Sequence, residues 1–170
     1  MSISTRGGDD GTTALAFNRR VSKTHPRVRA YGAVDEFSSA IGLARAFDPS
    51  PAHKEIILHI QKDLLRVMAM LAVDNEDKAK MGSRYQPITM EDVAWLDGLV
   101  SELEKTTPPF TGWVLPGDDP ATAHLHHART VCRRAEREII AAKELGHEVE
   151  PELLKYVNRL SDVFWLVARD

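Results

Sequence analysis

Cysteine is almost absent from the sequence: Cys132 is the only one in 170 residues. A single thiol has no partner within the chain, so an intramolecular disulfide framework is excluded. Proteins that fold without disulfides are typical of reducing compartments. We therefore expect a cytoplasmic protein, and a chain of this length can bury enough surface to be stable without cross-links.

Long apolar runs and a strong charge are also missing. No stretch reaches the roughly 20 apolar residues that span a bilayer, and the polar start MSISTRGGDDGTT lacks the apolar centre of a signal peptide. The net charge is −3, from 22 basic and 25 acidic residues, whereas nucleic-acid binders are usually basic. We expect neither a membrane nor a nucleic acid as a partner.

Helical periodicity accounts for most of the remaining sequence. Apolar residues recur at three- and four-residue spacings, which predicts helices near residues 34–48, 57–71, 89–103, 121–145 and 151–167. Thr89 and Asp92 resemble a capping box that opens the third of these helices. Residues 1–32 show no helical period. The sequence therefore predicts one all-α domain, in which an irregular arm (1–32) precedes a five-helix bundle (33–170).

The stretch TRGGDDGTT, residues 5–13, has the composition of a phosphate-binding loop. Glycines allow successive backbone N–H groups to face one anion, and Arg6 or Lys23 supplies positive charge. Asp9 or Asp10 offers a carboxylate to a magnesium ion that bridges phosphates. The stretch is not a Walker A motif, because no GK[ST] follows it. On composition alone, a solvated tail explains it better.

Two polar lines run beside the apolar seams of the last two predicted helices. The line on residues 121–145 consists of His126, Arg129, Arg133 and Glu136. The line on residues 151–167 consists of Leu154, Asn158, Ser161 and Trp165. Each member follows a seam residue by one position, so the two lines are able to converge, and two arginines one turn apart suit a polyphosphate or a carboxylate. From the residues alone, a charged surface with pairs such as Arg133–Glu136 is slightly favoured.

Other reactive side chains have simpler interpretations. His124 and His127 share a face only loosely with His126, and the Glu144–His147 pair is a single ExxH where a di-iron bundle needs two. Cys132 lies in an apolar seam, which favours packing over a nucleophilic role. Metal ligands stay unassigned.

Four blocks, in order along the chain, resemble the PduO-type ATP:cob(I)alamin adenosyltransferases. Residues 4–13 (STRGGDDGTT) are similar to the family's TRTGDxGTT, and residues 20–42 (RVSKTHPRVRAYGAVDEFSSAIG) to its RxSKxxxRVxAYGxVDELNSxIG. Residues 113–137 (WVLPGDDPATAHLHHARTVCRRAER) are similar to FxLPGG…ALHxARTxxRRAER, and residues 156–169 (YVNRLSDVFWLVAR) to YLNRLSDxLFxxAR. The match spans almost the whole chain, which makes it more specific than a glycine loop alone.

The resemblance implies a homotrimeric five-helix bundle with active sites between subunits. It implies transfer of the 5′-deoxyadenosyl group of ATP, used with Mg²⁺, to the Co(I) of a reduced corrinoid, with release of triphosphate. Cobalamin or another corrinoid would be the substrate, and a corrinoid reductase or an adenosylcobalamin-dependent mutase would be a partner. Because Co(I) is itself the nucleophile, no acid, base or nucleophile is expected from the protein, and Arg133 and Lys23 would stabilise the triphosphate.

Carried over by position, the resemblance implies two sets of site residues. The ATP set is Thr5, Arg6, Gly8, Asp9, Gly11, Thr12, Thr13, Lys23, Arg133, Glu136 and Asn158. The corrinoid set is Asp35, Trp113, His126, Arg129 and Trp165. Within the second set, Asp35 and Arg129 would pair across the subunit interface, and Trp113 would lie against the lower face of the corrin.

Four positions depart from the family pattern. Gly7, Ser38, Trp113 and Asp118 stand where the family has Thr, Asn, Phe and Gly. The sequence also stops at Asp170, so we expect no C-terminal tail over the corrin. Asp118 and this short end motivate an alternative function, a catalytically weak helical trimer that binds ATP and corrinoid as a cofactor carrier or sensor. A plain helical interaction module, with an unordered glycine loop, is the third possibility.

Overall fold

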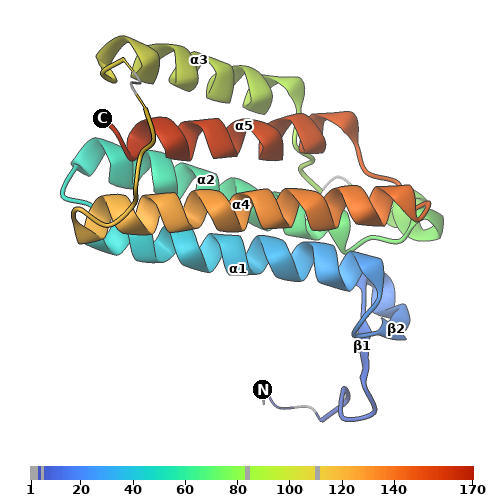
Figure 1. Ribbon diagram of the computed structural model, residues 1–170. Coiled ribbons are helices and arrows are strands. Elements are labelled where there is room, and N and C mark those ends of the chain that lie inside the picture. The colour runs from blue at the N-terminus through green and yellow to red at the C-terminus, as the bar shows by residue number, and fades with distance from the viewer. Residues whose placement is uncertain (1–3, 5, 83–84, 110–111) are drawn as a thin grey trace.

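Five α-helices make up most of the chain in this computed structural model, which describes residue 4 and residues 6–82, 85–109 and 112–170 (Figure 1). They are α1 (Pro26–Phe47), α2 (Pro51–Leu71), α3 (Met90–Thr106), α4 (Pro120–Glu144) and α5 (Pro151–Val167). A short 3-10 helix, η2 (Asn75–Lys80), follows α2. The prediction of a mostly helical chain is confirmed, and α3, α4 and α5 begin within one residue of where the sequence placed them.

Prolines and side-chain caps set where the helices begin. Proline occupies the first turn of α1, α2, α4 and α5, where its missing N–H leaves no helical hydrogen bond unmade. Before α4, the Asp119 carboxylate accepts from the N–H groups of Ala121 and Thr122 at 2.8 and 3.1 Å. Before α3, the Thr89 N–H donates to Asp92 at 2.7 Å, as the predicted capping box requires.

The helices pack in the order α2, α1, α4, α5 and α3, each against the next, and α3 lies on the outer side of α5 (Figure 1). Their facing sides form one hydrophobic core, in which Phe37 of α1 meets Phe164 of α5 edge to face at 5.5 Å. Polar bonds also cross this core: the Tyr156 hydroxyl donates to the Asp63 carboxylate at 2.8 Å and so ties α5 to α2. The order places α4 between α1 and α5.

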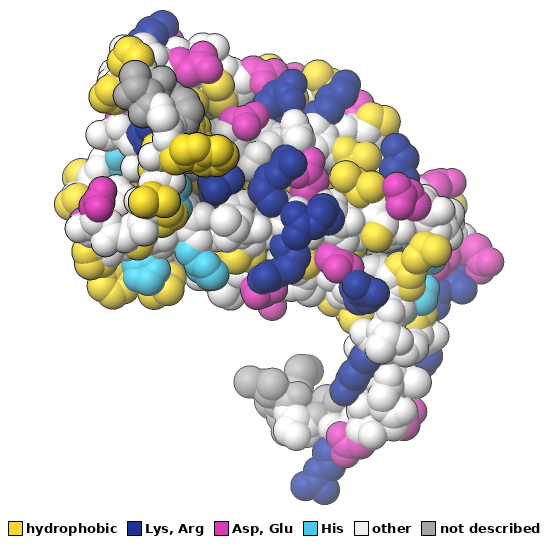
Figure 2. All heavy atoms as spheres, viewed as in Figure 1, with side chains coloured by type: hydrophobic (Ala, Val, Ile, Leu, Met, Phe, Trp, Pro, Cys, Tyr) yellow, Lys and Arg dark blue, Asp and Glu magenta, His cyan; other side chains and the backbone are white. Residues whose placement is uncertain are grey.

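The N-terminal arm contains a small hairpin that the sequence did not predict. β1 (Thr12–Ala14) pairs with β2 (Arg20–Ser22) in antiparallel register, with Thr13 opposite Val21, and the 3-10 turn η1 (Ala16–Asn18) lies between them. Strands of three residues are too short for their alternation to be recognised. Figures 1 and 2 show the arm hanging from the end of the bundle where α1 begins, with its tip away from the helices.

The bundle begins earlier than the predicted boundary between residues 32 and 33. α1 starts at Pro26, and its buried face runs from Arg27 through Ala30 and Val34. Arg27 is the first residue of this buried face, and because it is charged the apolar spacing did not extend the predicted helix to this point. The structural arm therefore ends at His25, whose ring accepts a hydrogen bond from the Arg27 N–H.

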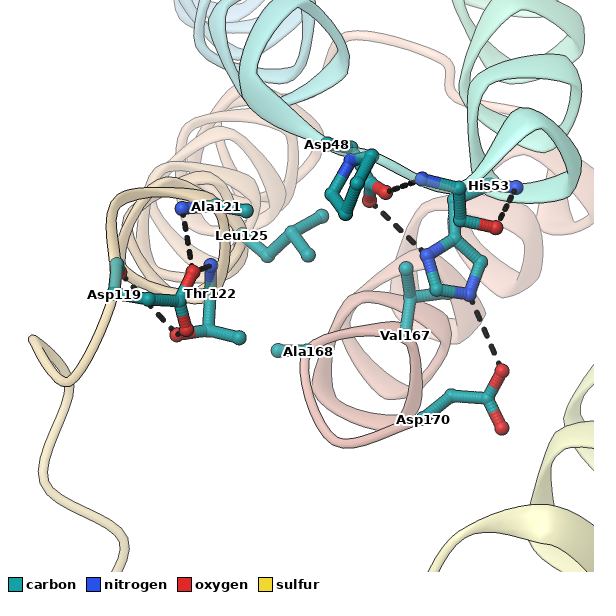
Figure 3. A pocket seen from close by; sticks show the side chains of 11 residues that line it. Asp48, His53, Asp119, Ala121, Thr122, Leu125, Val167, Ala168 and Asp170 are labelled. Atoms are coloured by element: carbon teal, nitrogen blue, oxygen red, sulfur yellow. Dashed lines mark hydrogen bonds and ion pairs between the residues drawn. The ribbon is translucent and has the colours of Figure 1, made fainter.

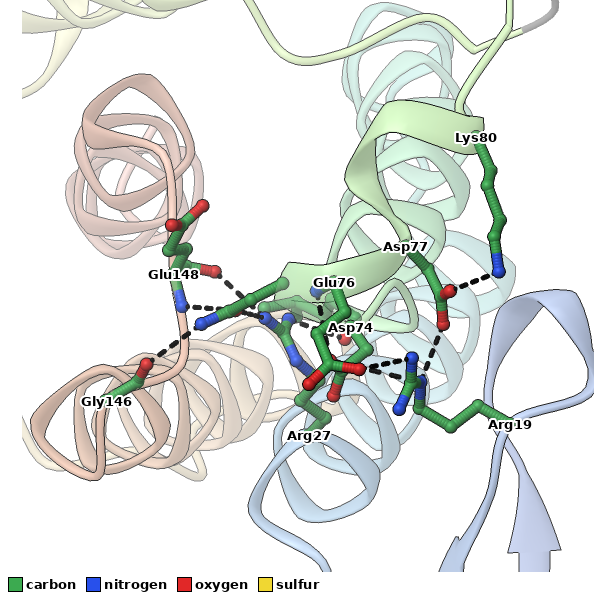
Figure 4. Close-up of polar contacts among 10 residues, drawn as sticks. Arg19, Arg27, Asp74, Glu76, Asp77, Lys80, Gly146 and Glu148 are labelled. Carbon is green, nitrogen blue, oxygen red and sulfur yellow. Dashed lines mark hydrogen bonds and ion pairs between the residues drawn. The ribbon is translucent and has the colours of Figure 1, made fainter.

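Arg27 is only 1% exposed and joins three turns at this end of the bundle (Figure 4). Its guanidinium donates to the Leu71 carbonyl at 3.2 Å, to Asn75 Oδ1 at 2.5 Å and to the Glu148 carbonyl at 3.4 Å. The Asn75 side chain in turn donates to the Gly146 carbonyl at 3.1 Å. Hydrogen bonds of this kind are what allow a charge to be buried.

Arg19 fastens the hairpin to the same region (Figure 4). Its Nε donates to Asp77 at 2.6 Å, and a terminal nitrogen donates to Glu76 at 2.9 Å. The Ala16 N–H donates to the Ala72 carbonyl at 2.9 Å. The base of the arm is thus held against η2 and the end of α2, while the glycine-rich tip projects.

The surface carries one feature that bears on function. Figure 2 shows Lys and Arg side chains gathered across the middle of the face that α4 presents. The exposed arginines of α4 include Arg133, Arg134 and Arg137.

Among the described residues, no helix is both long and apolar enough to cross a membrane.

Candidate functional site

The tip of the arm folds into a tight loop against the Lys23 side chain. The Asp9 N–H donates to the Arg6 carbonyl at 3.3 Å, and the Gly11 N–H donates to the Gly8 carbonyl at 3.2 Å, which makes two consecutive turns. Gly11 has φ of 79°, a conformation that favours glycine. A Cβ at Gly8 would lie 3.1 Å from the Lys23 ammonium and 3.1 Å from the Thr12 carbonyl oxygen, so a side chain there would require these neighbours to shift. The loop therefore has a backbone that turns tightly at its glycines and a lysine ammonium packed against it.

Most of the predicted ATP residues of the arm lie within this loop or on β1. The structure brings together Arg6, Gly8, Asp9, Gly11, Thr12, Thr13 and Lys23. Thr5 lies outside the described residues. This concentration of backbone donors and positive charge suits an anion such as a phosphate.

The polar lines of α4 and α5 meet at Glu136 and Asn158, although from the residues alone a charged surface was slightly favoured. Asn158 Nδ2 donates to Glu136 Oε1 at 2.8 Å, and the other carboxylate oxygen of Glu136 accepts from Arg133 at 2.7 Å. Glu136 is only 9% exposed, whereas about half of the Arg133 side chain faces solvent. The Arg133–Glu136 pair that a plain charged surface would show is present. It is also connected to Asn158 of α5 through Glu136, so the contacts join two helices. The buried carboxylate fixes Asn158 and Arg133, so that Arg133 presents its free donors outward.

Farther toward the beginning of α4, three more predicted residues form a second cluster. The His126 ring meets the Trp165 ring at 5.6 Å, and the Arg129 guanidinium lies over the same indole at 5.6 Å. Burial, together with the charges of Arg129 and Arg169, lowers the pKa of His126, so the imidazole is neutral near pH 7. His126 Nδ1 and Arg129 Nε are buried and have no hydrogen-bond partner among the described residues. Two of the four buried side-chain polar atoms without a partner among the described residues thus lie in this cluster, the others being Arg27 Nε and the Tyr85 hydroxyl.

The two remaining corrinoid residues are exposed. Asp35 lies on the outer side of α1 and makes no ion pair within the described part of the chain. Trp113 lies in the segment between α3 and α4, and 96% of its surface is accessible. Its indole is therefore accessible to a partner from outside the described part of the chain.

The glycine loop and the α4–α5 residues do not meet within one chain. Figure 1 shows the N-terminal arm hanging below the bundle from the end where α1 begins. Arg133 and Asn158 belong to α4 and α5. No hydrogen bond or ion pair of the described residues joins the two groups. The predicted ATP site is therefore in two parts in the single chain.

A cavity of about 490 Å³ lies at the other end of the bundle, and none of the predicted site residues lines it (Figure 3). His53 bridges two carboxylates there, with Nδ1 3.1 Å from Asp48 and Nε2 3.2 Å from Asp170. Asp119, also in the lining, is the cap of α4. The polar groups of this cavity are satisfied by the chain itself, so nothing in it points to a ligand.

Sequence reasoning missed some contacts of the site. Arg159 donates to Asn158 Oδ1 at 3.2 Å, and the Arg169 guanidinium lies 5.4 Å from the centre of the Trp165 ring. Both arginines lie close in sequence to members of the polar line, Arg159 next to Asn158 and Arg169 four residues after Trp165. This spacing was the signal by which the sequence could have indicated them. Cys132 is fully buried, and burial raises the pKa of its thiol, which agrees with the packing interpretation. The described residues contain no group of three or more His, Cys, Asp or Glu side chains that could hold a metal ion.

Comparison with known proteins gives concordant similarities. The family model for cobalamin adenosyltransferase matches residues 3–170. The chain is 42% identical over 171 residues to the corrinoid adenosyltransferase PduO of Citrobacter freundii, covering 99% of this chain and 49% of that protein, so it spans about half the length of this relative. It is 39% identical to a corrinoid adenosyltransferase of Mycobacterium leprae, covering 98% of this chain and 89% of that protein. A variant PduO-type ATP:corrinoid adenosyltransferase from Lactobacillus reuteri, complexed with cobalamin and ATP, superposes with a TM-score of 0.90 at 30% identity, covering 99% of this chain and 89% of that chain.

Proposed function

The chain belongs to the cobalamin adenosyltransferase family, and on that premise we propose that it transfers the 5′-deoxyadenosyl group of ATP to the cobalt of a reduced corrinoid and releases triphosphate. The observation that supports this most directly is the chain of contacts from Arg133 through Glu136 to Asn158 across α4 and α5. Asn158 lies 22 positions from Glu136 and belongs to a different block of the family pattern.

The reaction asks the protein for position and charge rather than for acid–base chemistry. Co(I) supplies the electron pair that forms the Co–C bond, and the pair of the breaking C5′–O bond leaves with the triphosphate. The protein must hold C5′ near the cobalt and stabilise the leaving group. The glycine loop with Lys23 and the outward donors of Arg133 are suited to the triphosphate. Magnesium, where it accompanies ATP, would supply positive charge to the phosphates, and Asp9 is the loop carboxylate that could help to hold it.

The two-part ATP site favours assembly, and we propose a homotrimer in which the arm of one copy completes the site on α4 and α5 of the next. In each chain the glycine loop projects away from the helices, and Arg133, Glu136 and Asn158 of α4 and α5 are not contacted by the described part of that loop. The unpartnered His126 Nδ1 and Arg129 Nε also favour a neighbour. Asp35, which has no ion pair among the described residues, is the proposed partner of Arg129 across that interface.

The corrinoid would lie near this interface, where aromatic and cationic side chains gather. Trp113 would cover its lower face, which keeps water and an axial ligand from the cobalt and eases reduction to Co(I). The indole suits this task because its nitrogen is a donor only and cannot ligate a metal. Trp165, with His126 and Arg129 against it, would border the same region. We place the protein in the cytoplasm, with a corrinoid reductase or an adenosylcobalamin-dependent mutase as a partner.

The test is incubation with ATP, Mg²⁺ and chemically reduced cobalamin, followed spectroscopically for a light-sensitive Co–C bond. We expect product from the wild type and a strong loss in Arg133→Ala, with Arg29→Ala as a matched control, because Arg29 is exposed and pairs only with Glu138 at 3.0 Å among the described residues. Binding of ATP and corrinoid without any product would instead indicate the carrier or sensor. Absence of ATP binding would overturn both.

A further inference from the structure

Arg20 reaches from β2 into the glycine loop and contacts it at three points. One terminal nitrogen of its guanidinium donates to the Gly7 carbonyl at 2.6 Å and to the Thr12 hydroxyl, and lies 3.4 Å from Asp10 Oδ1. Gly7 and Thr12 lie on either side of the segment that runs from Gly8 to Gly11. A single side chain thus closes the loop from outside.

Asp10 takes part in the same closure. Its Oδ1 accepts from the Thr12 N–H at 2.9 Å and from the Thr12 hydroxyl at 2.7 Å. The hydrogen bonds from Thr12, with a contribution from the charge of Arg20, lower the pKa of Asp10, so this carboxylate is anionic in the folded loop. The neighbouring Asp9 is exposed and its carboxylate has no hydrogen bond within the described part of the chain. Of the two adjacent aspartates, Asp10 therefore shapes the loop and Asp9 stays available to a ligand.

The adjacent arginine has a different task. Successive residues of a strand point to opposite sides. Arg19, just before β2, holds Asp77 and Glu76 of η2, whereas Arg20 holds the loop. The hairpin is thereby attached to the bundle on one side and to the glycine loop on the other.

From these contacts we infer that Arg20 is a positioning residue for ATP: with Asp10 and Thr12 it forms a clasp that shapes the glycine loop before the nucleotide arrives. The inference rests on the proposed function only in the identity of the ligand. A glycine-rich loop loses much conformational freedom on ordering, and a loop that is already shaped loses less when it binds. The hydrogen bond from Arg20 to the Gly7 carbonyl holds the start of the loop, and the bond to the Thr12 hydroxyl holds its end.

The first experiment measures the clasp without any ligand. The Gly11 and Thr12 amides both donate within the loop. In hydrogen exchange of the free protein, these two amides should exchange several-fold faster in Arg20→Ala than in the wild type. Arg29→Ala should leave these amides unchanged. Equal exchange in Arg20→Ala and the wild type would overturn the clasp, whatever the enzyme activity proves to be.

The second experiment measures its effect on the nucleotide. Arg20→Ala should raise the KM for ATP about 10- to 100-fold, the range for loss of a charged hydrogen bond, with kcat at saturating ATP nearly unchanged. Arg20→Lys should recover part of the loss, because an ammonium can still meet some of the acceptors. A fall in kcat equal to that in kcat/KM would overturn the inference, since it would indicate direct contact with the transition state.

A double-mutant cycle separates action through the loop from direct contact with ATP. Asp10→Ala alone should raise the KM, and adding Arg20→Ala should raise it little further, because both changes open one clasp. Independent, multiplying effects would show that Arg20 binds ATP by itself and would overturn its positioning role. If the wild type fails to bind ATP at all, the proposed function falls, whereas the exchange experiment still decides the existence of the clasp.

Discussion

Trp113 allows a sharp test, because its proposed role in corrinoid binding can be separated from any effect on folding. The side chain is 96% exposed in the single chain, so Trp113→Ala removes almost no buried surface. We expect the free energy of unfolding of the subunit to change by less than about 0.5 kcal/mol, as for other surface substitutions. Leu145→Ala, 69% exposed just beyond the far end of α4, is a matched control for the loss of an exposed apolar side chain.

The expected effect on corrinoid binding is much larger. If one face of the indole lies on the corrin, about 100 Å² of apolar surface leaves water, which is half or less of what a tryptophan can bury. At about 25 cal/mol per Å², this is about 2.5 kcal/mol, or roughly 70-fold in Kd. Trp113→Phe should retain most of this affinity and stay active. Trp113→His should lose the most turnover with Co(II) corrinoid, because imidazole can ligate cobalt.

The assay combines corrinoid titration, turnover with reducible Co(II) corrinoid, and the absorption spectrum of the bound Co(II) state. Wild type should give a ligand-free spectrum, and the Ala and His variants a five-coordinate one, while ATP affinity changes little in all three variants. Full activity and an unchanged spectrum in Trp113→Ala would refute the reasoning. Loss of the oligomer in that variant would show instead that Trp113 packs between subunits.

Three further predictions concern the charged residues. Arg133→Ala should weaken ATP binding by about 1.5–3 kcal/mol, measured by calorimetry; unaltered affinity with a large drop in Tm would make the residue structural. Asp35→Asn should raise the KM for corrinoid and weaken assembly in sedimentation more than it changes the KM for ATP, because its proposed partner is Arg129 of a neighbour; an effect on ATP alone would contradict that pairing. The hydrogen bond from Arg19, followed by that from Lys80, lowers the pKa of Asp77 to about 2, so its contribution to stability is complete above the unfolded value of about 4 and is lost as the pH falls toward 2. The drop in Tm between pH 4 and pH 2 should therefore be smaller in Asp77→Asn than in the wild type, and equal drops would rule the contribution out.

The bundle was largely predictable because its signals are local. Apolar spacing, prolines and the Thr89–Asp92 pair each act within a turn or two, and α3, α4 and α5 begin where these signals place them. The start of α1 was missed because Arg27 occupies the position where an apolar residue would have extended the period. Its burial depends on partners up to 121 positions away, which no local pattern reveals.

The candidate site was predictable in part for a similar reason. An equal offset from two buried seams was enough to bring Glu136 and Asn158 together, because packing of the seams fixes how the neighbouring faces meet. The attachment of the arm was not predictable, since the bond between Arg19 and Asp77 joins residues 58 positions apart on irregular segments. Nor does composition indicate that the glycine loop lies away from the helices of its own chain.

The contacts of buried Arg27 also bear on the order of events in folding. They join positions separated by 44, 48 and 121 residues. Closing segments of such length is entropically unfavourable until other contacts hold the ends together, so these bonds should form after the helices have docked. A substitution there would leave the folding rate almost unchanged and accelerate unfolding, which a chevron plot resolves. The point to which the N-terminal arm is attached is therefore among the last parts of the molecule to form, and it governs how long the folded state persists more than how fast it is reached.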